Sequence, residues 1–582
     1  MKLVDALRAL QAASPAARLL PLQLVCGFTP LHVQTFIAAH VQARAPDRKV
    51  VPSSGLFGDC LGNLERIAEL ETLPEVAVVC LEWPDFDPRL GLRNVGGWRP
   101  SDLDDISRTV TSQVKRFVAA IACVGERVPL RISLPTLPLP PVSYFPGARS
   151  GAFDLSLRSA VLELGAQAAL MPNVAVVNAQ QLDRASPIDQ RRDVAADLAS
   201  GFPYTLAHAS ALGSAIAELV VPPVPKKGLI TDLDDTLWRG LVGEVGPSGV
   251  TWDLDHKSQM HALYQQLLVS LAESGVLLAI ASKNEPAAVA QVFEAREQLA
   301  PLREPFFPTE VSWGPKSEAV ARILRTWNIG ADSVVFVDDS PLELAEVQAA
   351  WPELTCLRFP KESDGQAYAL LERLRDLFGK ATLSAEDAVR RESLRQGLAF
   401  SEESAVGGSD PEQFLSQIDA ELSLTYGTRP SDSRAFELIN KTNQFNLNGR
   451  RYSEGEWSAY LSDPKTFLVS VAYKDKFGPL GTIGVLAGQL DGQSHALSVD
   501  TWVLSCRAFS RRIEHACLKA IFARFDAERL NLDFRATPKN APLQAFLREL
   551  LGSAAAGPVT VQRSVFEKTC LPLYHRLKEL SL

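Results

Sequence analysis

The stretch KKGLITDLDDT (residues 226–236) decides the fold of the central part of the chain. Its apolar run has the composition of a buried strand, and Asp232 and Asp234 follow where that strand ends. Further apolar runs recur downstream with helical patterns between them, at 276–284 (VLLAIASKN), 334–340 (VVFVDDS) and 354–359 (LTCLRF). Strands that alternate with helices in this way predict a parallel sheet, which we place within residues 228–380.

Polar side chains stand where these predicted strands end and where a following helix begins. In open parallel sheets, ligands bind beyond the carboxyl ends of the strands, so we expect these side chains to converge on one site. Lys316 belongs to this set because the segment SWGPKSEAV places it at a helix start. The other members are Asp232, Asp234, Thr236, Ser282, Asp338 and Asp339.

These residue types, in this order, indicate metal-assisted phosphoryl transfer. A carboxylate can attack phosphorus and form an aspartyl phosphate, and Asp232 is the candidate nucleophile. Asp234 points the same way along an extended backbone, so it can protonate the leaving oxygen and later deprotonate water. Ser282 and Lys316 can bind the oxygens of the phosphoryl group.

The same residues predict a metal site. Several carboxylates close together are costly unless a cation neutralises them, and Mg²⁺ suits an all-oxygen site that keeps waters and phosphate oxygens. We therefore expect Mg²⁺ as the cofactor. Its candidate ligands are Asp232, Asp234 through its backbone, Asp338 and Asp339.

Composition and charge exclude several classes of function. The chain has 582 residues, of which 46% are apolar and 22% charged, as in ordinary globular proteins. The net charge of −9 argues against a nucleic-acid or anionic-membrane partner, and no apolar stretch reaches the roughly 18 residues of a spanning helix. Eight scattered cysteines without a CxxC pair indicate reduced thiols in a cytoplasmic protein. The N-terminal MKLVDALRALQAA predicts an amphipathic helix and not a signal peptide.

The region before the central sheet predicts a second parallel α/β domain over residues 1–220. Helical patterns there separate apolar runs at 22–27, 76–83, 130–137 and 174–179. The Pro-rich segment VVPPVPKK (220–227) predicts a linker between the two domains.

The region after the central sheet predicts a mixed α and β domain over residues 411–582. AEDAVRRESLRQGLAF (385–400) has the pattern of a connecting helix, and SEESAVGGSD (401–410) that of a second linker. A helix is expected over 512–530. Consecutive antiparallel strands are expected before it, over 467–474, 481–490 and 495–505.

The ordered pattern DxDxT, Ser, Lys and acidic pair resembles the haloacid dehalogenase superfamily. Within it, residues 226–250 and the segments SKNEP (282–286) and VDDSPLELAEVQ (337–348) resemble the FkbH-like branch. The resemblance to that branch extends to three later segments of this chain: INKTNQFNLNGRRYSEGEW, VDTWVLSCRAFSRRIEHACL and TPKNAPLQAFL. The resemblance favours Asp339 over Asp338 as a metal ligand and implies substrate contacts at Lys283 and Asn284. The family more often has Asn and Gly where this chain has Asp235 and Arg239.

The resemblance implies a specific reaction. FkbH-like proteins load a glyceryl unit from 1,3-bisphosphoglycerate onto a phosphopantetheinylated acyl carrier protein, for polyketide biosynthesis. The product is a thioester without phosphate, so the reaction needs acyl transfer to sulfur and removal of phosphate. The predicted site at Asp232 suits the removal of phosphate. Two alternatives stay open: a Mg²⁺-dependent phosphatase of a soluble metabolite, and a non-enzymatic module that binds a carrier protein.

The segment at 499–518 resembles the strand, turn and helix of a GCN5-related acetyltransferase-like domain. Arg507 lies in a turn that is usually rich in Gly, where it can meet a pantetheine phosphate or form a solvated helix start. Cys506 precedes it, and a helix N-terminus beside Arg residues lowers a thiol pKa. Cys506 is therefore a candidate catalytic acyl acceptor, with a buried core cysteine as the alternative. Four asparagines in INKTNQFNLN can bind a ligand or satisfy turn backbone, and Asn540 can cap a helix or contact a ligand.

The segment GFTPLH (27–32) resembles the place where SGNH-type hydrolases carry a nucleophilic serine, but Phe28 and Thr29 stand there. His208 resembles their late histidine, with Thr205 where an acid is usual. A non-catalytic domain that acts as a scaffold or docks a carrier is therefore expected, with His208 structural. The expected fold is α/β: a doubly wound, parallel-sheet, haloacid-dehalogenase-like core, flanked by an N-terminal SGNH-like α/β domain and a C-terminal mixed α+β acetyltransferase-like domain.

Overall fold

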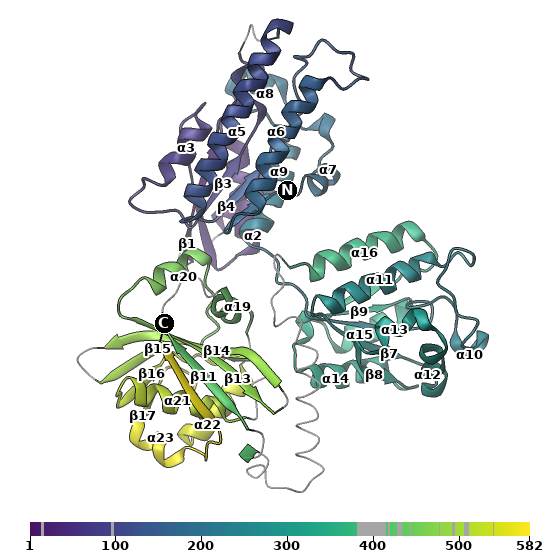
Figure 1. The fold of residues 1–582 in the computed structure, drawn as a ribbon, viewed down its shortest axis with the longest axis vertical. Helices are drawn as coiled ribbons and strands as arrows, with labels where there is room; N and C mark the ends of the chain where they lie inside the picture. The colour runs from purple at the N-terminus through teal and green to yellow at the C-terminus, as the bar shows by residue number, and fades with distance from the viewer. Residues whose placement is uncertain are drawn as a thin grey trace. The chain divides into compact units, whose positions relative to one another are not determined.

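The chain forms two compact units in a computed structural model, and each is described by itself. One comprises Met1–Pro223 with Tyr452–Ala459, and the other comprises Val224–Arg451 with Tyr460–Leu582. The first contains one β-sheet and the second contains two (Figure 1). The structure describes residues 1–12, 17–94, 98–380, 415–416, 419–427, 433–442, 444–476, 478–491, 495–505, 511–538 and 540–581.

The first sheet is parallel and has the strand order β2-β1-β3-β4-β5. Its strands are β1 (Arg18–Cys26), β2 (Arg48–Ser54), β3 (Val76–Cys80), β4 (Leu130–Ser133) and β5 (Val174–Val176). Alternate residues of β3 belong to different core clusters, so both faces of the sheet are buried. The helices that cover them include α2 (Leu31–Arg44), α3 (Cys60–Ile67), α5 (Leu103–Gly125), α6 (Ala152–Ala169) and α9 (Leu206–Val220).

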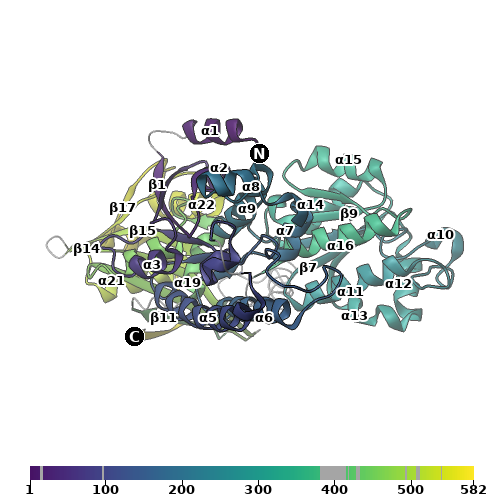
Figure 2. The same cartoon turned by 90° about the horizontal axis from the view of Figure 1, so that it is seen from above.

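All four apolar runs predicted in this region are strands, and the amphipathic helix predicted at the N-terminus is α1 (Leu3–Gln11). Helices α5 and α6 lie side by side, as do α2 and α9 (Figure 2). Strand β2 was not predicted. It lies at the edge of the sheet with most of its residues exposed or half-buried, so it needs no continuous apolar run.

The second sheet, in the central part of the chain, is also parallel, with the order β10-β9-β6-β7-β8. Its strands are β6 (Gly228–Thr231), β7 (Leu277–Ser282), β8 (Phe306–Val311), β9 (Val334–Asp338) and β10 (Thr355–Arg358). One face packs on α11 (Gln259–Glu273), α12 (Pro286–Ala295) and α16 (Asp364–Phe378). The other packs on α14 (Lys316–Trp327) and α15 (Pro341–Ala350), so the sheet is doubly wound as predicted. The edge strand β8 was not predicted, because Pro308 and Glu310 interrupt its apolar pattern.

The third sheet is mixed, with the order β17-β16-β15-β14-β13-β11-β18. Its strands are β11 (Glu421–Tyr426), β13 (Thr466–Asp475), β14 (Gly478–Asp491), β15 (Ala496–Leu504), β16 (Arg529–Leu532), β17 (Val559–Gln562) and β18 (Arg576–Ser581). The antiparallel pairing predicted for β13, β14 and β15 is confirmed. Strand β16 is parallel to β15 along Ala496–Val499, and the short β12 (Phe445–Asn446) pairs with β15 farther along, at Val503 and Leu504. The expected helix is α21 (Ile513–Arg524).

Three further expectations concern the whole chain. The connecting helix at 385–400 and the linker at 401–410 lie outside the described residues. The seven cysteines within the described ranges are all unpaired. A search of the described helices finds none with the length and apolar character needed to cross a membrane.

Candidate active site

Two neighbouring strands of the central sheet bring three of the predicted acids together. Asp232 follows β6 directly, and Asp338 ends β9, which pairs in parallel with β6. The Asp232 amide donates a hydrogen bond to the Val337 carbonyl at 2.9 Å, which holds the two strand ends side by side. One carboxylate oxygen from each of Asp232, Asp338 and Asp339 lies within 4.8 Å of the others.

Lys316 is the buried cation of this cluster. It begins α14 and is 4% exposed. Its Nζ lies 2.5 Å from Asp338 Oδ2 and 3.0 Å from Asp232 Oδ1. Asp338 is fully buried and also accepts a hydrogen bond from the Ser340 amide at 2.9 Å. Asp338 is therefore held in the ion pair with Lys316, and Asp339 is the more exposed carboxylate of the two.

The electrostatics of the cluster fit a divalent cation. Burial raises the pKa of Asp232, and Asp338 raises it further, against the opposing effects of Lys316 and a Ser282 hydrogen bond. Three carboxylates carry three negative charges when ionised, and two cations face them: Lys316 at Asp232 and Asp338, and Lys361 at Asp339. Asp232 Oδ1 is buried and lies outside hydrogen-bond geometry despite its closeness to Lys316. An all-oxygen donor set with an unsatisfied carboxylate oxygen matches the ligand preference of Mg²⁺.

Asp234 stands apart from this cluster. Its Oδ1 accepts hydrogen bonds from Trp238 Nε1 at 2.9 Å and the Val242 amide at 3.3 Å, and its Oδ2 accepts one from Asn284 Nδ2 at 3.0 Å. The Asp234 carboxylate, predicted as the proton shuttle, is therefore held by donors of its own and is not part of the cluster of three acids. Trp238 was missed from sequence, because a Trp in an apolar segment looks like a core residue and only its indole N–H reveals the second role.

The other residues predicted to contact the substrate differ in how deeply they are buried. Ser282 and Asn284 are buried at the end of β7, where Asn284 Nδ2 donates to Ser282 Oγ at 3.4 Å. Thr236 is fully buried, and its hydroxyl accepts a hydrogen bond from the Asp339 amide at 3.1 Å. It therefore positions the Asp339 loop and is not open to a substrate. Lys283 is partly exposed and pairs with Glu343 at 2.9 Å.

Lys361 is a cation at the site that the sequence analysis missed. Its Nζ lies 2.6 Å from Asp235 Oδ2 and 2.8 Å from Asp339 Oδ2. Asp235 has a left-handed backbone (φ 53°) and also accepts a hydrogen bond from the Gly240 amide at 2.8 Å. Lys361 follows the carboxyl end of β10, so the rule used for the other strand ends would have found it.

The candidates in the C-terminal region fall into two groups. Cys506, Arg507 and one of the four asparagines lie outside the described residues. Asn446 Oδ1 accepts from the amides of Asn448 at 3.3 Å and Gly449 at 2.7 Å. Asn540 donates to the Asn446 carbonyl at 3.0 Å. For Asn446, the structure favours the alternative in which the amide satisfies backbone groups. Asn540 stands at the N-cap position of α22 (Ala541–Leu551) as expected, but its side chain makes no capping hydrogen bond to that helix.

His208 in the N-terminal region is structural, as expected. It is fully buried near the start of α9, where the Thr205 hydroxyl caps the helix by accepting from the His208 amide at 3.3 Å. Its Nε2 lies 2.9 Å from Thr136 Oγ1 and its Nδ1 lies 3.0 Å from Ser186 Oγ. Among the described residues, neither Phe28 nor Thr29 pairs with His208 as a nucleophile with its base.

We expect His208 to make this region sensitive to acid. Burial, with help from Arg191, lowers the pKa of His208 from 6.5 to about 3. The unfolded chain therefore binds more protons below pH 6.5, and the folded state loses about 2 kcal/mol between pH 7.5 and pH 5. His208→Gln should reduce this loss, measured by hydrogen exchange of α9 peptides at both pH values. His32→Gln, on the neighbouring α2, is the control, and an equal pH response in His208→Gln and the parent would contradict the assignment.

The fold of part of this chain has a counterpart of known structure. No family model and no curated protein matches this chain. The N-terminal part of the protein BF1531 from Bacteroides fragilis, which contains a phosphatase domain complexed with Mg, has a similar structure. The match has a TM-score of 0.52 and 19% sequence identity, and covers 66% of this chain and 100% of that one. The match supports the α/β fold of this chain.

A second solved structure is matched less well. An uncharacterized protein from Corynebacterium glutamicum is 19% identical, with a TM-score of 0.18, over 27% of this chain and 98% of that one. This match carries no argument about the fold. The similarity to the Bacteroides protein is therefore the match that supports the fold.

Proposed function

We propose that the central domain is a Mg²⁺-dependent phosphatase that works through an aspartyl phosphate. The observation that carries this proposal is the buried Asp232 carboxylate, which ends a parallel strand beside Lys316 and two further acids. Asp232 Oδ1 makes no hydrogen bond although it lies 3.0 Å from Lys316 Nζ, so it has a lone pair for a cation or for attack on phosphorus. The Mg bound to the phosphatase domain of the similar Bacteroides protein supports the same cofactor here.

The proposed reaction has two steps. In the first, an Asp232 oxygen bonds to phosphorus, the bond from phosphorus to the leaving oxygen breaks, and Asp234 gives its proton to that oxygen. In the second, water attacks the same phosphorus, Asp234 takes the proton of the water, and the bond to Asp232 breaks to release phosphate. The hydrogen bonds from Trp238 and Asn284 hold Asp234 in place for both proton transfers.

The remaining residues of the site would stabilise the negative charge of the phosphoryl group. Lys316 stabilises the negative charge of the transferring group, and Ser282 at the adjacent strand end can donate a hydrogen bond to one of its oxygens. Asp232 and Asp339 would hold Mg²⁺, together with the backbone of Asp234. Mg²⁺, when bound, neutralises charge on the phosphoryl oxygens and on the nucleophile.

For the full activity we propose transfer of a glyceryl unit from 1,3-bisphosphoglycerate to the phosphopantetheine thiol of an acyl carrier protein, in polyketide biosynthesis. A thiol sulfur attacks the carbonyl of the acyl phosphate, a thioester forms and phosphate leaves. The remaining phosphate ester is cleaved at Asp232. Cys506 is proposed as an acyl relay and Arg507 as a contact to the pantetheine phosphate. These assignments are supported by the resemblance of residues 226–550 to FkbH-like proteins.

A phosphatase of a soluble metabolite is the second candidate. It is favoured by one observation: the described residues gathered at the site, Asp232, Asp338, Asp339 and Lys316, are the acids and the cation that removal of phosphate needs. A free phosphate ester would then be the substrate.

Intact-protein mass spectrometry tests these proposals. A phosphopantetheinylated carrier protein is incubated with this protein, Mg²⁺ and enzymatically generated 1,3-bisphosphoglycerate. The parent should add a glyceryl mass, and the Asp232→Asn variant should add the heavier phosphoglyceryl mass, because acyl transfer continues while phosphate removal stops. No mass increment on a competent carrier, together with steady phosphate release, would favour the metabolite phosphatase. Carrier binding without either reaction would overturn both.

A further inference from the structure

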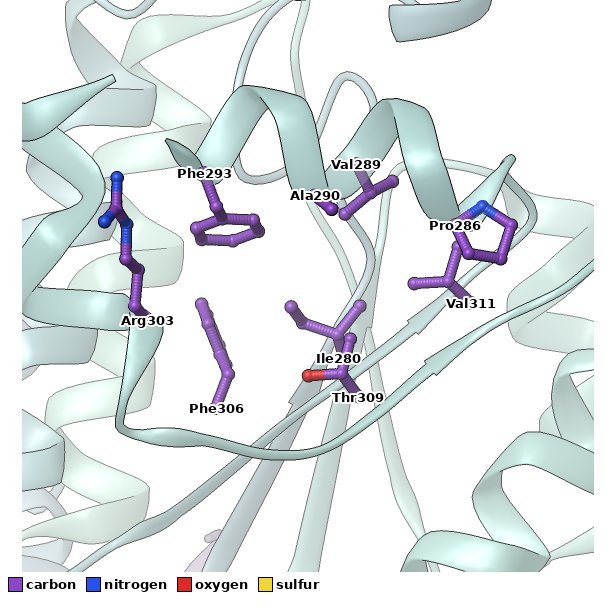
Figure 3. Close-up of a pocket in the computed structure, with 9 residues that line it drawn as sticks. All are labelled: Ile280, Pro286, Val289, Ala290, Phe293, Arg303, Phe306, Thr309 and Val311. Atoms are coloured by element: carbon purple, nitrogen blue, oxygen red, sulfur yellow. The ribbon is translucent and has the colours of Figure 1, made fainter. Parts of the chain in front are cut away.

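An apolar groove runs beside the candidate active site, between α12 and the outer edge of the central sheet. Phe293 and Phe306 line one end, Pro286 and Val311 the other, and Ile280 lies between them (Figure 3). Its volume of 260 Å³ is below the roughly 300–1,000 Å³ of sites for drug-sized ligands. The groove therefore suits a slender ligand.

The groove follows β8 along its length, and its occupant must be extended. Strand β8 ends the strand order, so its outer side faces no other strand of the sheet. Its six residues span roughly 20 Å at 3.3 Å per residue. Thr309 pairs with Ile280 in register, so its side chain points to the same face of the sheet and offers an exposed hydroxyl within the groove. This hydroxyl can hydrogen-bond with an amide group of the occupant.

The carboxyl end of the groove reaches the active site. Val311 pairs with Ser282 across β7 and β8, and the Ser312 amide donates to the Ser282 carbonyl at 3.1 Å. Pro286 comes two residues after Asn284, which donates to the Asp234 carboxylate. A chain lying in the groove therefore presents this end to the residues proposed to carry out the chemistry.

The opposite end of the groove carries a cation. Arg303 lies there beside Phe293 and Phe306 (Figure 3). Its guanidinium donates to the Glu294 carbonyl at 3.0 Å, and no carboxylate of the described residues forms an ion pair with it. An exposed Arg with spare donors is suited to a phosphate group.

We propose that this groove binds the phosphopantetheine arm of a carrier, with its phosphate at Arg303 and its thiol end at Ser282. The proposal rests on the proposed function and adds the place where the acyl group is held for dephosphorylation. With bond lengths like those of a peptide backbone, the extended arm covers a distance similar to β8. It also has amides that can hydrogen-bond with the Thr309 hydroxyl, and a phosphate at the end away from its thiol.

Calorimetry with small probes tests the groove without any turnover. The probes are 4′-phosphopantetheine and pantetheine, and the full-length protein carries Asp232→Asn so that the phosphate of the probe is not removed. Arg303→Gln should weaken 4′-phosphopantetheine binding about tenfold or more, the loss of one charge-assisted contact, and leave pantetheine binding unchanged. Ala290→Trp, which fills the open side of the groove, should weaken the binding of both probes.

Arg325→Gln provides the matched control. Arg325 is also exposed and also donates to a main-chain carbonyl, at 3.3 Å, but it lies on α14 on the other face of the sheet. It should change neither affinity. The proposal is overturned if neither probe binds, if Arg325→Gln weakens binding as much as Arg303→Gln, or if both groove variants bind like the parent. Thermal unfolding of each variant identifies any that fails to fold.

The two proposals fail separately. Phosphate release from a free ester by the parent needs no arm, and arm binding by Asp232→Asn needs no phosphate release. Binding without release would leave the groove proposal standing and remove the proposed function. Release without binding would do the reverse.

Discussion

Asp232→Asn lowers the rate of Mg²⁺-dependent phosphate release at least about 1,000-fold, because an amide cannot form the aspartyl phosphate. The measurement is release of inorganic phosphate from p-nitrophenyl phosphate by the full-length protein. Acid-quenched parent enzyme should also show one added phosphoryl group by mass spectrometry, which the variant should lack. A rate within tenfold of the parent would rule out Asp232 as the nucleophile.

The same substitution should leave the fold intact. Asparagine keeps the shape of the side chain and removes a carboxylate whose pKa is raised by burial and by Asp338. In the absence of Mg²⁺, the variant should therefore unfold at the same temperature as the parent or at a higher one. Asp364→Asn, at the exposed start of α16, is the matched control and should retain full activity.

Lys316→Met should destabilise the central domain by about 3–5 kcal/mol in the absence of Mg²⁺. It leaves Asp232 and the fully buried Asp338 without their shared cation, and an unpaired buried charge has this cost. The folded pKa values of both acids are raised above their ordinary value, so the stability they contribute is present at low pH and lost as pH rises. The loss in Lys316→Met should therefore be larger at pH 8 than at pH 5.

Hydrogen exchange of peptides from β6 and β9 measures this loss within the domain itself. Lys283→Met is the control. Lys283 also pairs with a carboxylate, but it is 35% exposed, and a surface pair of this kind contributes at most about 1 kcal/mol. Equal losses in the two variants would show that the buried cluster is not held by Lys316.

The elements predicted from sequence are those whose pattern is set by burial on both faces. The runs that became β6, β7 and β9 are continuous and apolar because helices cover both sides of each strand. The edge strands β2 and β8 escaped prediction because an edge strand carries polar residues and, in β8, a proline. Edge strands therefore follow from the completed sheet and not from a local pattern.

The residues of the site also differ in whether the sequence could predict them. Asp232, Ser282, Lys316 and the pair at 338–339 were predicted together, because each stands at the end of an apolar run or at the start of a helix. The packing of the folded chain then determined which partner each of those residues contacts. Thr236 turned away from any substrate to bind the Asp339 amide, and only the packed structure decides such an orientation.

The sequence by itself determined which strands end in acidic residues, and so the chemistry proposed for the site. Only the tertiary structure decided which residues those acids contact. Lys361 and Asp235 are 126 residues apart, and they pair because β10 lies beside β9 in the strand order. Trp238 turns its indole N–H to Asp234, and Arg303 reaches the end of a groove that exists only once α12 covers β8. Local patterns record burial and backbone geometry, whereas strand order and side-chain packing depend on contacts between residues far apart in the chain.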